Sequence, residues 1–452
     1  MKQNLSAGER ALSMRRVHPR NCKPDSSRCR RGRFTCPDLL SVLQRAAKAA
    51  PTTSLDFYHG VPALAGTKSR QIRGCTPPIR NGHGGNIWQV AEEYGKDINK
   101  LVDFSASINP LGIPVNVKNA LIKNMDLLTH YPPPDCRALV KGLSAYLRVP
   151  EENILMGNGS IELIYAIPPI FSPANVVIPV PTFSEYEKSV KTHGDPITFF
   201  TCREKDNFRI DVNELLKSLP AHGGMVFLCN PNNPTGGIIS RDELIFLAKK
   251  CRRHHAVLVI DETFINFVAD ESAVTMIHHV DLPVIVIRSF TKFFAIPGLR
   301  LGYLVANKGI VEHIRKFHPP WSVNLLAQIA GLEMLKDTAY IRTTKEYVRA
   351  ETEKLTARFR AMHDVIKVYP AAANFILCKF RAKYDYREIY DNLIIKYNLV
   401  VRNCHNFRQL NDSYFRVAVR TGSENSRLIA ALSELLRAAP LRVEPGDFRS
   451  RG

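Results

Sequence analysis

The 452-residue sequence has no run of about 18 consecutive apolar residues, the length that a membrane-spanning helix needs. Its N-terminus also lacks the apolar core of a secretory signal, so we expect neither a membrane span nor export, and the cytoplasm is the default location. Close cysteine pairs are missing too: Cys22, Cys29 and Cys36 are seven residues apart, which fits neither a zinc site nor a dense disulfide framework. We therefore predict no bound metal and reduced thiols.

Acidic residues are scarce near the N-terminus. Residues 1–82 contain 16 Lys and Arg against 4 Asp and Glu, so +12 of the formal net charge of +20 lies there. This composition, with its Ser, Pro and Gly, predicts a disordered or loosely attached extension. A basic extension can touch nucleic acid, an anionic membrane or an acidic partner, and a solvated tail is an equally good interpretation. It lacks the two helices of a helix-turn-helix, so a DNA-binding regulator is the weaker alternative and we do not expect nucleic acid as a partner.

From residue 83 onward, short apolar runs alternate with amphipathic stretches. The apolar runs are rich in β-branched residues, as buried parallel strands are. One amphipathic stretch, Ser240–His254, begins with a capping box, because Glu243 follows Ser240 by three residues. The alternation predicts an α/β fold with a mostly parallel sheet, helices on both faces, and a ligand site at the carboxyl ends of the strands. The predicted strands are Val176–Pro179, Met225–Cys229, Val257–Ile260, Val284–Ile287 and Leu301–Ala306.

The pattern changes again after residue 310. A long helix is predicted over Thr338–Arg360, strands over Ala373–Phe380, Leu399–Arg402 and Tyr414–Val419, and a last helix over Ser423–Ala438. These elements predict a smaller α+β domain packed on the large one. We therefore expect a basic extension, an N-terminal arm contributing to the active site, a large domain, a small domain and a tail, at residues 1–82, 83–115, 116–315, 316–440 and 441–452 respectively.

A lysine in an apolar segment is the first candidate for chemistry. Lys292 lies within Ser289–Tyr303, with hydroxyl side chains just before it and Arg300 eight residues after it. A lysine amine attacks carbonyls only when it is neutral, and apolar surroundings lower its pKa. Lys292 is therefore a candidate covalent anchor for a cofactor through a Schiff base.

Three further motifs follow predicted strands. The turn Gly157-Asn158-Gly159-Ser160 precedes an apolar helix and can hold a phosphate, although most such turns are ordinary turns. The loop Asn230–Gly236, with three asparagines and two prolines, either presents amides to a ligand or forms a rigid turn. Asp261 lies at the tip of a buried strand, where an unpaired carboxylate is costly, so we expect a cationic partner such as a pyridinium nitrogen.

The order and spacing of these motifs resemble the aspartate-aminotransferase-like, fold type I family of pyridoxal phosphate enzymes, over about residues 83 to 438. The resemblance implies a homodimer, with Tyr131 reaching the phosphate in the neighbouring subunit. Where many members have a tyrosine beside the cofactor ring, this chain has Phe264. The cofactor contacts that the resemblance implies are Lys292 as the covalent anchor, Asp261 at the ring nitrogen, Asn233 at the ring hydroxyl, Phe183 stacked on the ring, and Asn158, Gly159, Ser160, Ser289 and Arg300 at the phosphate.

Within this family the chain resembles the branch that contains histidinol-phosphate aminotransferase and threonine-phosphate decarboxylase. The decarboxylase serves the synthesis of the cobalamin nucleotide loop. The segments His83–Asn86 and Asp103–Gly112 are more similar to the decarboxylase side. That side implies release of carbon dioxide from threonine phosphate, with serine phosphate as a second substrate; transamination of histidinol phosphate is the alternative. The substrate contacts implied are His83, Gly84, Asn86, Asn109, Arg416 and Arg420, although His83 and Asn86 can equally belong to a capped loop and Arg420 can be a surface charge.

Overall fold

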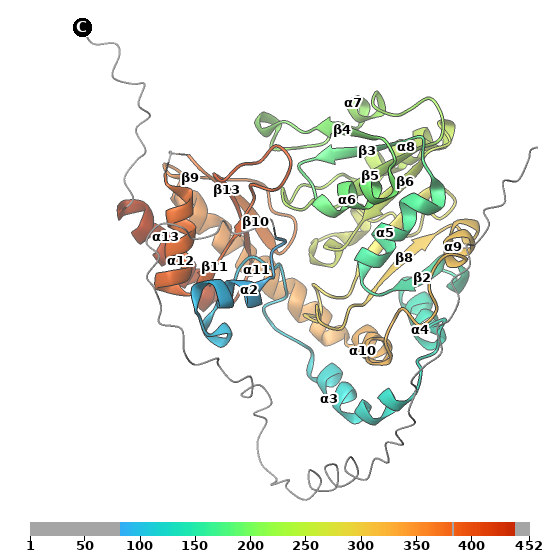
Figure 1. Cartoon of the computed structure of the whole chain (residues 1–452), viewed down its shortest axis with the longest axis horizontal. Helices are drawn as coiled ribbons and strands as arrows, with labels where there is room; N and C mark the ends of the chain where they lie inside the picture. The colour runs from blue at the N-terminus through green and yellow to red at the C-terminus, as the bar shows by residue number, and fades with distance from the viewer. Residues whose placement is uncertain (1–81, 382–383, 439–452) are drawn as a thin grey trace, which may run out of the picture. The chain divides into compact units, whose positions relative to one another are not determined.

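The computed structural model describes residues 82–381 and 384–438 (Figure 1). The chain divides into two units, residues 1–76 and 77–452, and every described residue belongs to the second unit. The predicted extension, apart from Gly82, and the predicted tail lie outside the described residues, as do Cys22, Cys29 and Cys36. None of the described helices is long and apolar enough to cross a membrane.

A seven-stranded sheet forms the centre of the larger part of the molecule. All neighbouring strands pair in parallel except that β8 runs antiparallel to both of its neighbours, β2 and β7. The prediction of a parallel strand over Leu301–Ala306 is therefore wrong, because a loop without a helix connects this strand to β7 and parallel neighbours need a crossover. The strands, in sheet order, are β2 (Ile154–Gly157), β8 (Gly302–Ala306), β7 (Val284–Ser289), β6 (Val257–Asp261), β5 (Gly224–Cys229), β3 (Asn175–Val180) and β4 (Ile197–Thr201).

Helices cover both faces of this sheet (Figure 1). Side chains alternate along β6, so that Val259 packs in one apolar cluster with helices α5 and α6, whereas Leu258 and Ile260 pack in another with α8. The capping box predicted for Ser240 and Glu243 is present at the start of α8. The helices around the sheet are α5 (Ser160–Phe171), α6 (Ser184–His193), α7 (Val212–Leu216), α8 (Arg241–Arg253) and α9 (Lys308–Arg315).

A four-stranded antiparallel sheet, in the order β12-β13-β10-β9, forms the C-terminal part. The N-terminal arm packs on this part of the chain. Its strand β1 (Val102–Asp103) pairs in parallel with β11 (Leu399–Val400) in a separate two-stranded sheet, and α2 (Ile87–Tyr94) packs against an apolar cluster that includes Val400. In Figure 1 the blue α2 accordingly lies beside the orange α12. The elements of this part are β9 (Ile366–Val368), β10 (Phe375–Phe380), β12 (Arg402–Asn403), β13 (Tyr414–Ala418), α11 (Thr338–Ala361), α12 (Tyr386–Tyr397) and α13 (Gly422–Ala438).

Three helices form a further apolar cluster beside the seven-stranded sheet. They are α3 (Val115–Lys123), α4 (Arg137–Leu147) and α10 (Leu325–Lys336), and they contribute residues such as Val117, Leu143 and Ala330 to one core. Burying these side chains together fixes the segment that carries Tyr131, which lies between α3 and α4.

Candidate active site

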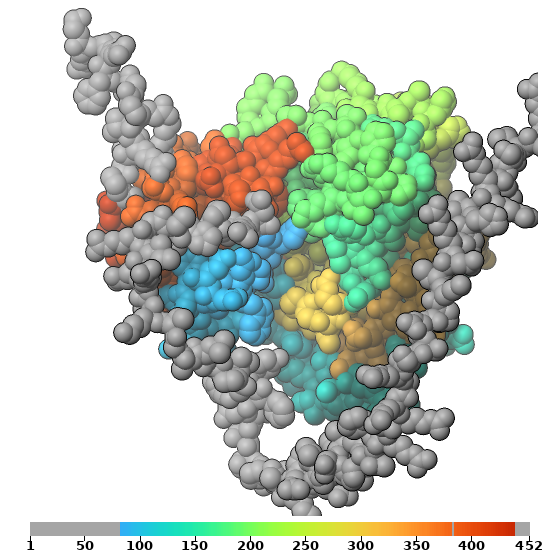
Figure 2. Space-filling model, viewed as in Figure 1, coloured from blue at the N-terminus to red at the C-terminus, as the bar shows by residue number. Residues whose placement is uncertain are grey.

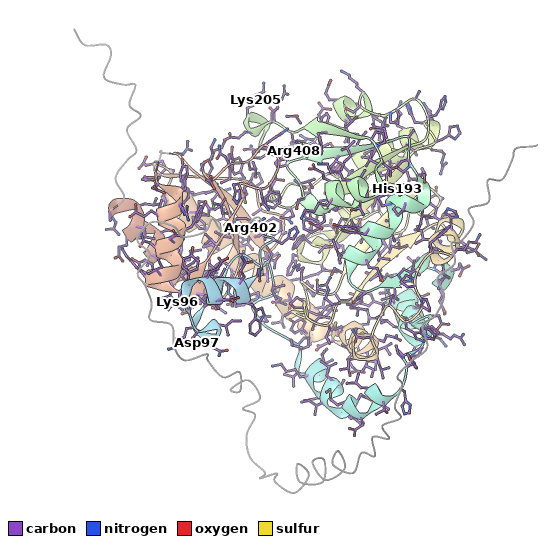
Figure 3. All side chains as sticks on the ribbon, in the orientation of Figure 1. Lys96, Asp97, His193, Lys205, Arg402 and Arg408 are labelled. Atoms are coloured by element: carbon purple, nitrogen blue, oxygen red, sulfur yellow. The ribbon has the colours of Figure 1, made fainter. Side chains whose placement is uncertain are left out.

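A cavity of about 380 Å³ opens at the carboxyl ends of the central strands. Asp261 ends β6, Lys292 follows β7 and Asn233 follows β5, so three strands bring these side chains together. Ser160 and Phe183, at the starts of α5 and α6, line the same cavity, and β12 and β13 contribute Arg402 and Arg416. Arg402 lies where the C-terminal strands face the large sheet (Figure 3).

Lys292 is half-buried in the wall of this cavity. Burial, with the positive charges of Arg416 and Arg300 nearby, lowers the pKa of Lys292 to about 8. Its backbone is fixed because its carbonyl accepts a hydrogen bond from the Asn109 N–H at 3.0 Å. A substantial neutral fraction of this amine near neutral pH is the condition for Schiff-base chemistry.

Asp261 is buried with its carboxylate held by two donors. Its Oδ2 accepts a hydrogen bond from the Tyr186 hydroxyl at 2.8 Å, and its Oδ1 accepts one from the Thr263 N–H at 2.9 Å. Burial raises the pKa of Asp261, and no lysine or arginine of the described residues lies within ion-pair distance of it. A cationic ring nitrogen would offset that unfavourable burial. The sequence did not single out Tyr186; its signal was an aromatic residue in the first turn of the helix after Phe183.

The start of α5 lies against the Arg300 guanidinium. Gly159 has a φ of +77°, and a Cβ there would collide with that guanidinium. A Cβ on Gly302 of β8 would likewise collide with the backbone N of Ser160. The helix N-terminus and Arg300 are therefore as close as glycine permits, which gathers N–H groups, the helix dipole and a cation for one anion.

Two other residues predicted for this anion site lie just outside the cavity. The Ser289 hydroxyl is buried and lies 2.7 Å from the Thr291 Oγ1. Asn158 is exposed, and its N–H donates to Glu162 at 2.6 Å. Of these residues, Thr291 lines the cavity.

Arg416 and Arg402 are buried guanidiniums in the same cavity wall. Arg416 donates to the Asn233 side-chain oxygen and, at 2.7 Å, to the Ser105 carbonyl. Arg402 donates to the Asn403 carbonyl at 2.8 Å and to Asn406 Oδ1 at 2.6 Å. Among the described residues, neither has a carboxylate within ion-pair distance, which leaves two cationic groups for anions.

Arg402 is a cavity residue that the sequence analysis missed. It ends the strand predicted over Leu399–Arg402, and the sequence offers no reason to choose it over neighbouring Asn403. Its place in the site follows from the strand pairing in the structure, where Arg402 and Arg416 are register partners in β12 and β13.

The N-terminal arm closes one side of the cavity. His83 and Gly84 line it, and a Cβ on Gly84 would collide with the Ser105 carbonyl. The Gly85 N–H donates to the Ser105 hydroxyl at 2.8 Å. On the face drawn in Figure 2, blue residues of the arm meet the green residues of the large part. Asn86 instead caps α2 and borders a separate small pocket.

Besides Ser289, Asn158, Gly159 and Asn86, three further predicted site residues do not line the cavity. The Asn109 amide donates to the Phe293 carbonyl at 2.8 Å and so supports the lysine loop from behind. Arg420 forms an ion pair with Glu424 at 2.9 Å. Tyr131 is 85% exposed on the surface, next to the ring of Trp321.

The cavity wall fits pyridoxal phosphate. Three buried polar side-chain atoms of residues that line it have no hydrogen-bond partner among the described residues: Ser107 Oγ, Thr263 Oγ1 and Arg416 Nε. Buried polar atoms are normally satisfied, so these atoms indicate a ligand. The N-terminus of α5 with Arg300 suits a phosphate, Asp261 suits a pyridinium nitrogen and Lys292 suits the aldehyde.

A mostly parallel sheet that carries this lysine, acid and anion site at its carboxyl edge defines the fold type I class of pyridoxal phosphate enzymes. The model of the family "Aminotransferase class I and II" matches residues 99–432, and the chain belongs to this family. Its cofactor is pyridoxal 5′-phosphate.

Individual relatives carry two different names. The chain is 36% identical over 370 residues to the threonine-phosphate decarboxylase of Salmonella typhimurium, which covers 82% of this chain and 99% of that protein. The structure of the histidinol-phosphate aminotransferase from Clostridium acetobutylicum has a TM-score of 0.69 at 32% identity, covering 75% of this chain and 100% of that one. The structure of L-threonine-O-3-phosphate decarboxylase from Porphyromonas gingivalis has a TM-score of 0.66 at 27% identity, covering 74% and 99%. The names of the relatives therefore do not distinguish decarboxylation from transamination.

Proposed function

We propose that the chain decarboxylates L-threonine O-3-phosphate to (R)-1-amino-2-propanol O-2-phosphate and carbon dioxide, for the cobalamin nucleotide loop. The observation that carries this proposal is the pair of buried guanidiniums, Arg402 and Arg416, which lack carboxylate partners among the described residues. Threonine phosphate has two anionic groups, a carboxylate and a phosphate. Histidinol phosphate has one, its phosphate, because a phosphorylated CH2OH group takes the place of the carboxylate. The Salmonella typhimurium relative, 36% identical over 370 residues, is also named a threonine-phosphate decarboxylase.

The positions of the two arginines suggest which anion each binds. Arg416 is bonded to Asn233 and is close enough to Lys292 to lower its pKa, so it suits the α-carboxylate at the reacting carbon. Arg402 adjoins His83 of the arm, farther along the cavity wall, and suits the phosphate. Two anchored ends leave the substrate one orientation, which selects the bond that breaks.

The remaining residues have roles in the same reaction. When bound, pyridoxal phosphate supplies an electron sink for the bond that breaks at Cα. Asp261 keeps a proton on the ring nitrogen. The C–C bond to the carboxylate breaks, carbon dioxide leaves, and a proton from Nζ of Lys292 replaces it at Cα. His83 and Gly84 exclude water from the phosphate end of the cavity.

The experiment is to incubate the purified holoenzyme with each candidate substrate. Carbon dioxide released from threonine phosphate without any keto acid supports the proposal. The same assay with serine phosphate tests the second substrate, whose product would be ethanolamine phosphate. Turnover of histidinol phosphate that requires a keto acid, without carbon dioxide from either phosphoamino acid, would move the function to the aminotransferase, which the 32%-identical structure of that name favours.

We also propose that the chain works as a homodimer. Large apolar side chains are exposed on α3, including Val115 at 72% and Ile122 at 74%, and the exposed Tyr131 follows α3 in the chain. Monomers rarely expose so many neighbouring apolar side chains. Sedimentation equilibrium should give about twice the 50.9 kDa of one chain, whereas a mass of one chain would contradict the proposal.

A further inference from the structure

A second carboxylate lines the cavity besides that of Asp261. Glu185 lies in the first turn of α6, and its side chain is 11% exposed. Anions of a substrate would be repelled by an unpaired carboxylate at this position, so its partners decide its effect.

Every oxygen of Glu185 is occupied. Oε1 lies 2.6 Å from Nε2 of His83 and 2.7 Å from Nζ of Lys188, and Oε2 accepts a hydrogen bond from the Tyr165 hydroxyl at 2.6 Å. Burial by itself would raise the pKa of Glu185, but the hydrogen bonds from Lys188 and Tyr165 outweigh it and hold the pKa below its usual value. Glu185 is therefore ionised and can only accept, so the proton at the short contact belongs to Nε2 of His83.

The pairing fixes the direction in which the imidazole faces. The His83 ring packs against the Phe183 ring, with 5.5 Å between their centroids. With Nε2 turned to Glu185, the other ring nitrogen, Nδ1, has no hydrogen-bond partner in the part of the chain that the structure describes. Arg402 lines the cavity on the same side.

We propose that Glu185 is a positioning residue, which holds His83 with Nε2 turned away and Nδ1–H presented, beside Arg402, to the phosphate of the substrate. This inference rests on the proposed function, because it assigns the phosphate end of the same cavity. Nδ1 is a donor only when the imidazole carries both protons. A carboxylate bound to one nitrogen stabilises that doubly protonated form.

Glu185 opposes the positive charges and the burial that disfavour a second proton on His83. Burial lowers the pKa of His83, and Lys188 of α6 and Arg402 of β12 lower it further. The Glu185 carboxylate, supported by Tyr165 of α5, is the group that opposes them. The net pKa of His83 stays below its usual value even with Glu185 present, so the imidazole gains its second proton as the phosphate dianion binds. Without Glu185 that proton is held less well, and Nδ1 turns a lone pair toward the phosphate.

Two substitutions on α6 with opposite expected effects test the proposal. Glu185→Gln keeps the shape but removes the charge, so KM for threonine phosphate should rise about tenfold at pH 7.5, as for a weakened hydrogen bond to a charged group. The increase should shrink as the pH falls and the imidazole regains its proton. Lys188→Met removes a positive charge, so KM should begin to rise at higher pH than in the wild type. The substrate phosphate loses its second proton at about pH 6 in all variants, so the comparison isolates the imidazole.

A second readout needs no turnover. In holoenzyme with ¹³C-labelled histidine, the signal that disappears in His83→Gln identifies His83 among the 14 histidines. Its pKa should fall in Glu185→Gln and rise in Lys188→Met, and adding inorganic phosphate should raise it in the wild type. A KM that rises by the same factor at every pH in Glu185→Gln, or a His83 pKa that does not move, would overturn the proposal. If the wild type releases no carbon dioxide, the proposed function fails. The titration with phosphate still decides whether Glu185 controls the pKa of His83.

Discussion

Two regions of the molecule, the large sheet and the C-terminal sheet, bury arginine in opposite ways. Behind the cavity, Arg288 is 2% exposed and forms ion pairs with Glu262 at 2.8 Å and Glu271 at 2.7 Å. Burial alone would lower the pKa of Arg288, but Glu262 above all raises it. In the cavity, burial lowers the pKa of Arg416 to about 10 and also lowers that of Arg402. A buried arginine with carboxylate partners keeps those buried carboxylates paired, whereas one without them is available for a ligand.

The largest effect is expected at the lysine in the cavity. Lys292→Ala should lower kcat/KM by at least about ten-thousandfold, because the covalent anchor and the proton at Cα are both lost. It should also remove the visible absorbance of lysine-bound cofactor. Colour that survives dialysis, with borohydride still trapping the cofactor on the protein, would show that another lysine is the anchor.

The arginines without carboxylate partners should affect activity more than stability. Arg416→Leu should lower kcat/KM about a thousandfold, because truncating one partner of a desolvated ion pair costs several kcal/mol. Unfolding of the cofactor-free protein by urea should show no loss of stability, since no carboxylate is left unpaired. A large loss of stability would place Arg416 in the same class as Arg288.

The paired arginine should show the reverse. Arg288→Met leaves Glu262 buried and unpaired, so the free energy of unfolding should fall by about 3–5 kcal/mol. The control is Arg137→Met, which breaks an exposed ion pair with Asp135 and should change stability by less than about 1 kcal/mol. Urea denaturation of both variants gives the comparison, and equal effects would contradict it.

The cavity charges should also set the pH dependence of cofactor uptake. The pKa of Lys292 is about 8, so the amine becomes neutral as the pH rises through that value. Uptake of pyridoxal phosphate by cofactor-free protein should therefore quicken up to about pH 8 and then level off. In Arg416→Leu a neighbouring positive charge is gone, the pKa rises, and the midpoint should move to higher pH. Stopped-flow absorbance measures both, and an unmoved midpoint would contradict the coupling.

The smallest effect is expected where a neutral partner is removed. Tyr186→Phe deletes one hydrogen bond to Asp261 and should lower kcat about fivefold, in line with about 1 kcal/mol for one bond. Tyr94→Phe, which removes a phenol that donates to Asp391 away from the cavity, is the matched control and should leave kcat unchanged. Equal kcat values in the two variants would show that Tyr186 does not support Asp261.

The sequence predicted the parts of the site that depend on local pattern. Asp261 and Lys292 follow apolar strands, and the carboxyl ends of such strands meet at one edge, so their convergence could be expected. Arg402 and Glu185 could not be chosen in this way, because their importance depends on which partners they have or lack in space. Asn109 shows the same limit: its amide bonds to Phe293, 184 residues away, and no local signal reveals that.

The direction of β8 was mispredicted for a related reason. An apolar, β-branched run gives the same pattern in a parallel and an antiparallel strand, provided both faces are buried. Only the connection distinguishes them, and the loop that carries Lys292 contains no crossover helix. That loop also places Lys292 between two neighbouring strands, which is why the wrong strand direction did not displace the predicted site.

The pairing of β1 with β11 has a consequence for how the protein is made. Val102 is aligned with Leu399, so a strand near the start of the described chain can pair only after a strand near its end has been synthesised. Contacts that join such distant segments form slowly, because a long loop must close first. During synthesis the large sheet can be complete before β11 leaves the ribosome, and the arm that carries His83 and Gly84 then lacks the strand with which β1 pairs. The finished cavity is therefore a property of the whole chain, and fragments ending before residue 399 should bind substrate poorly even where the lysine loop has folded.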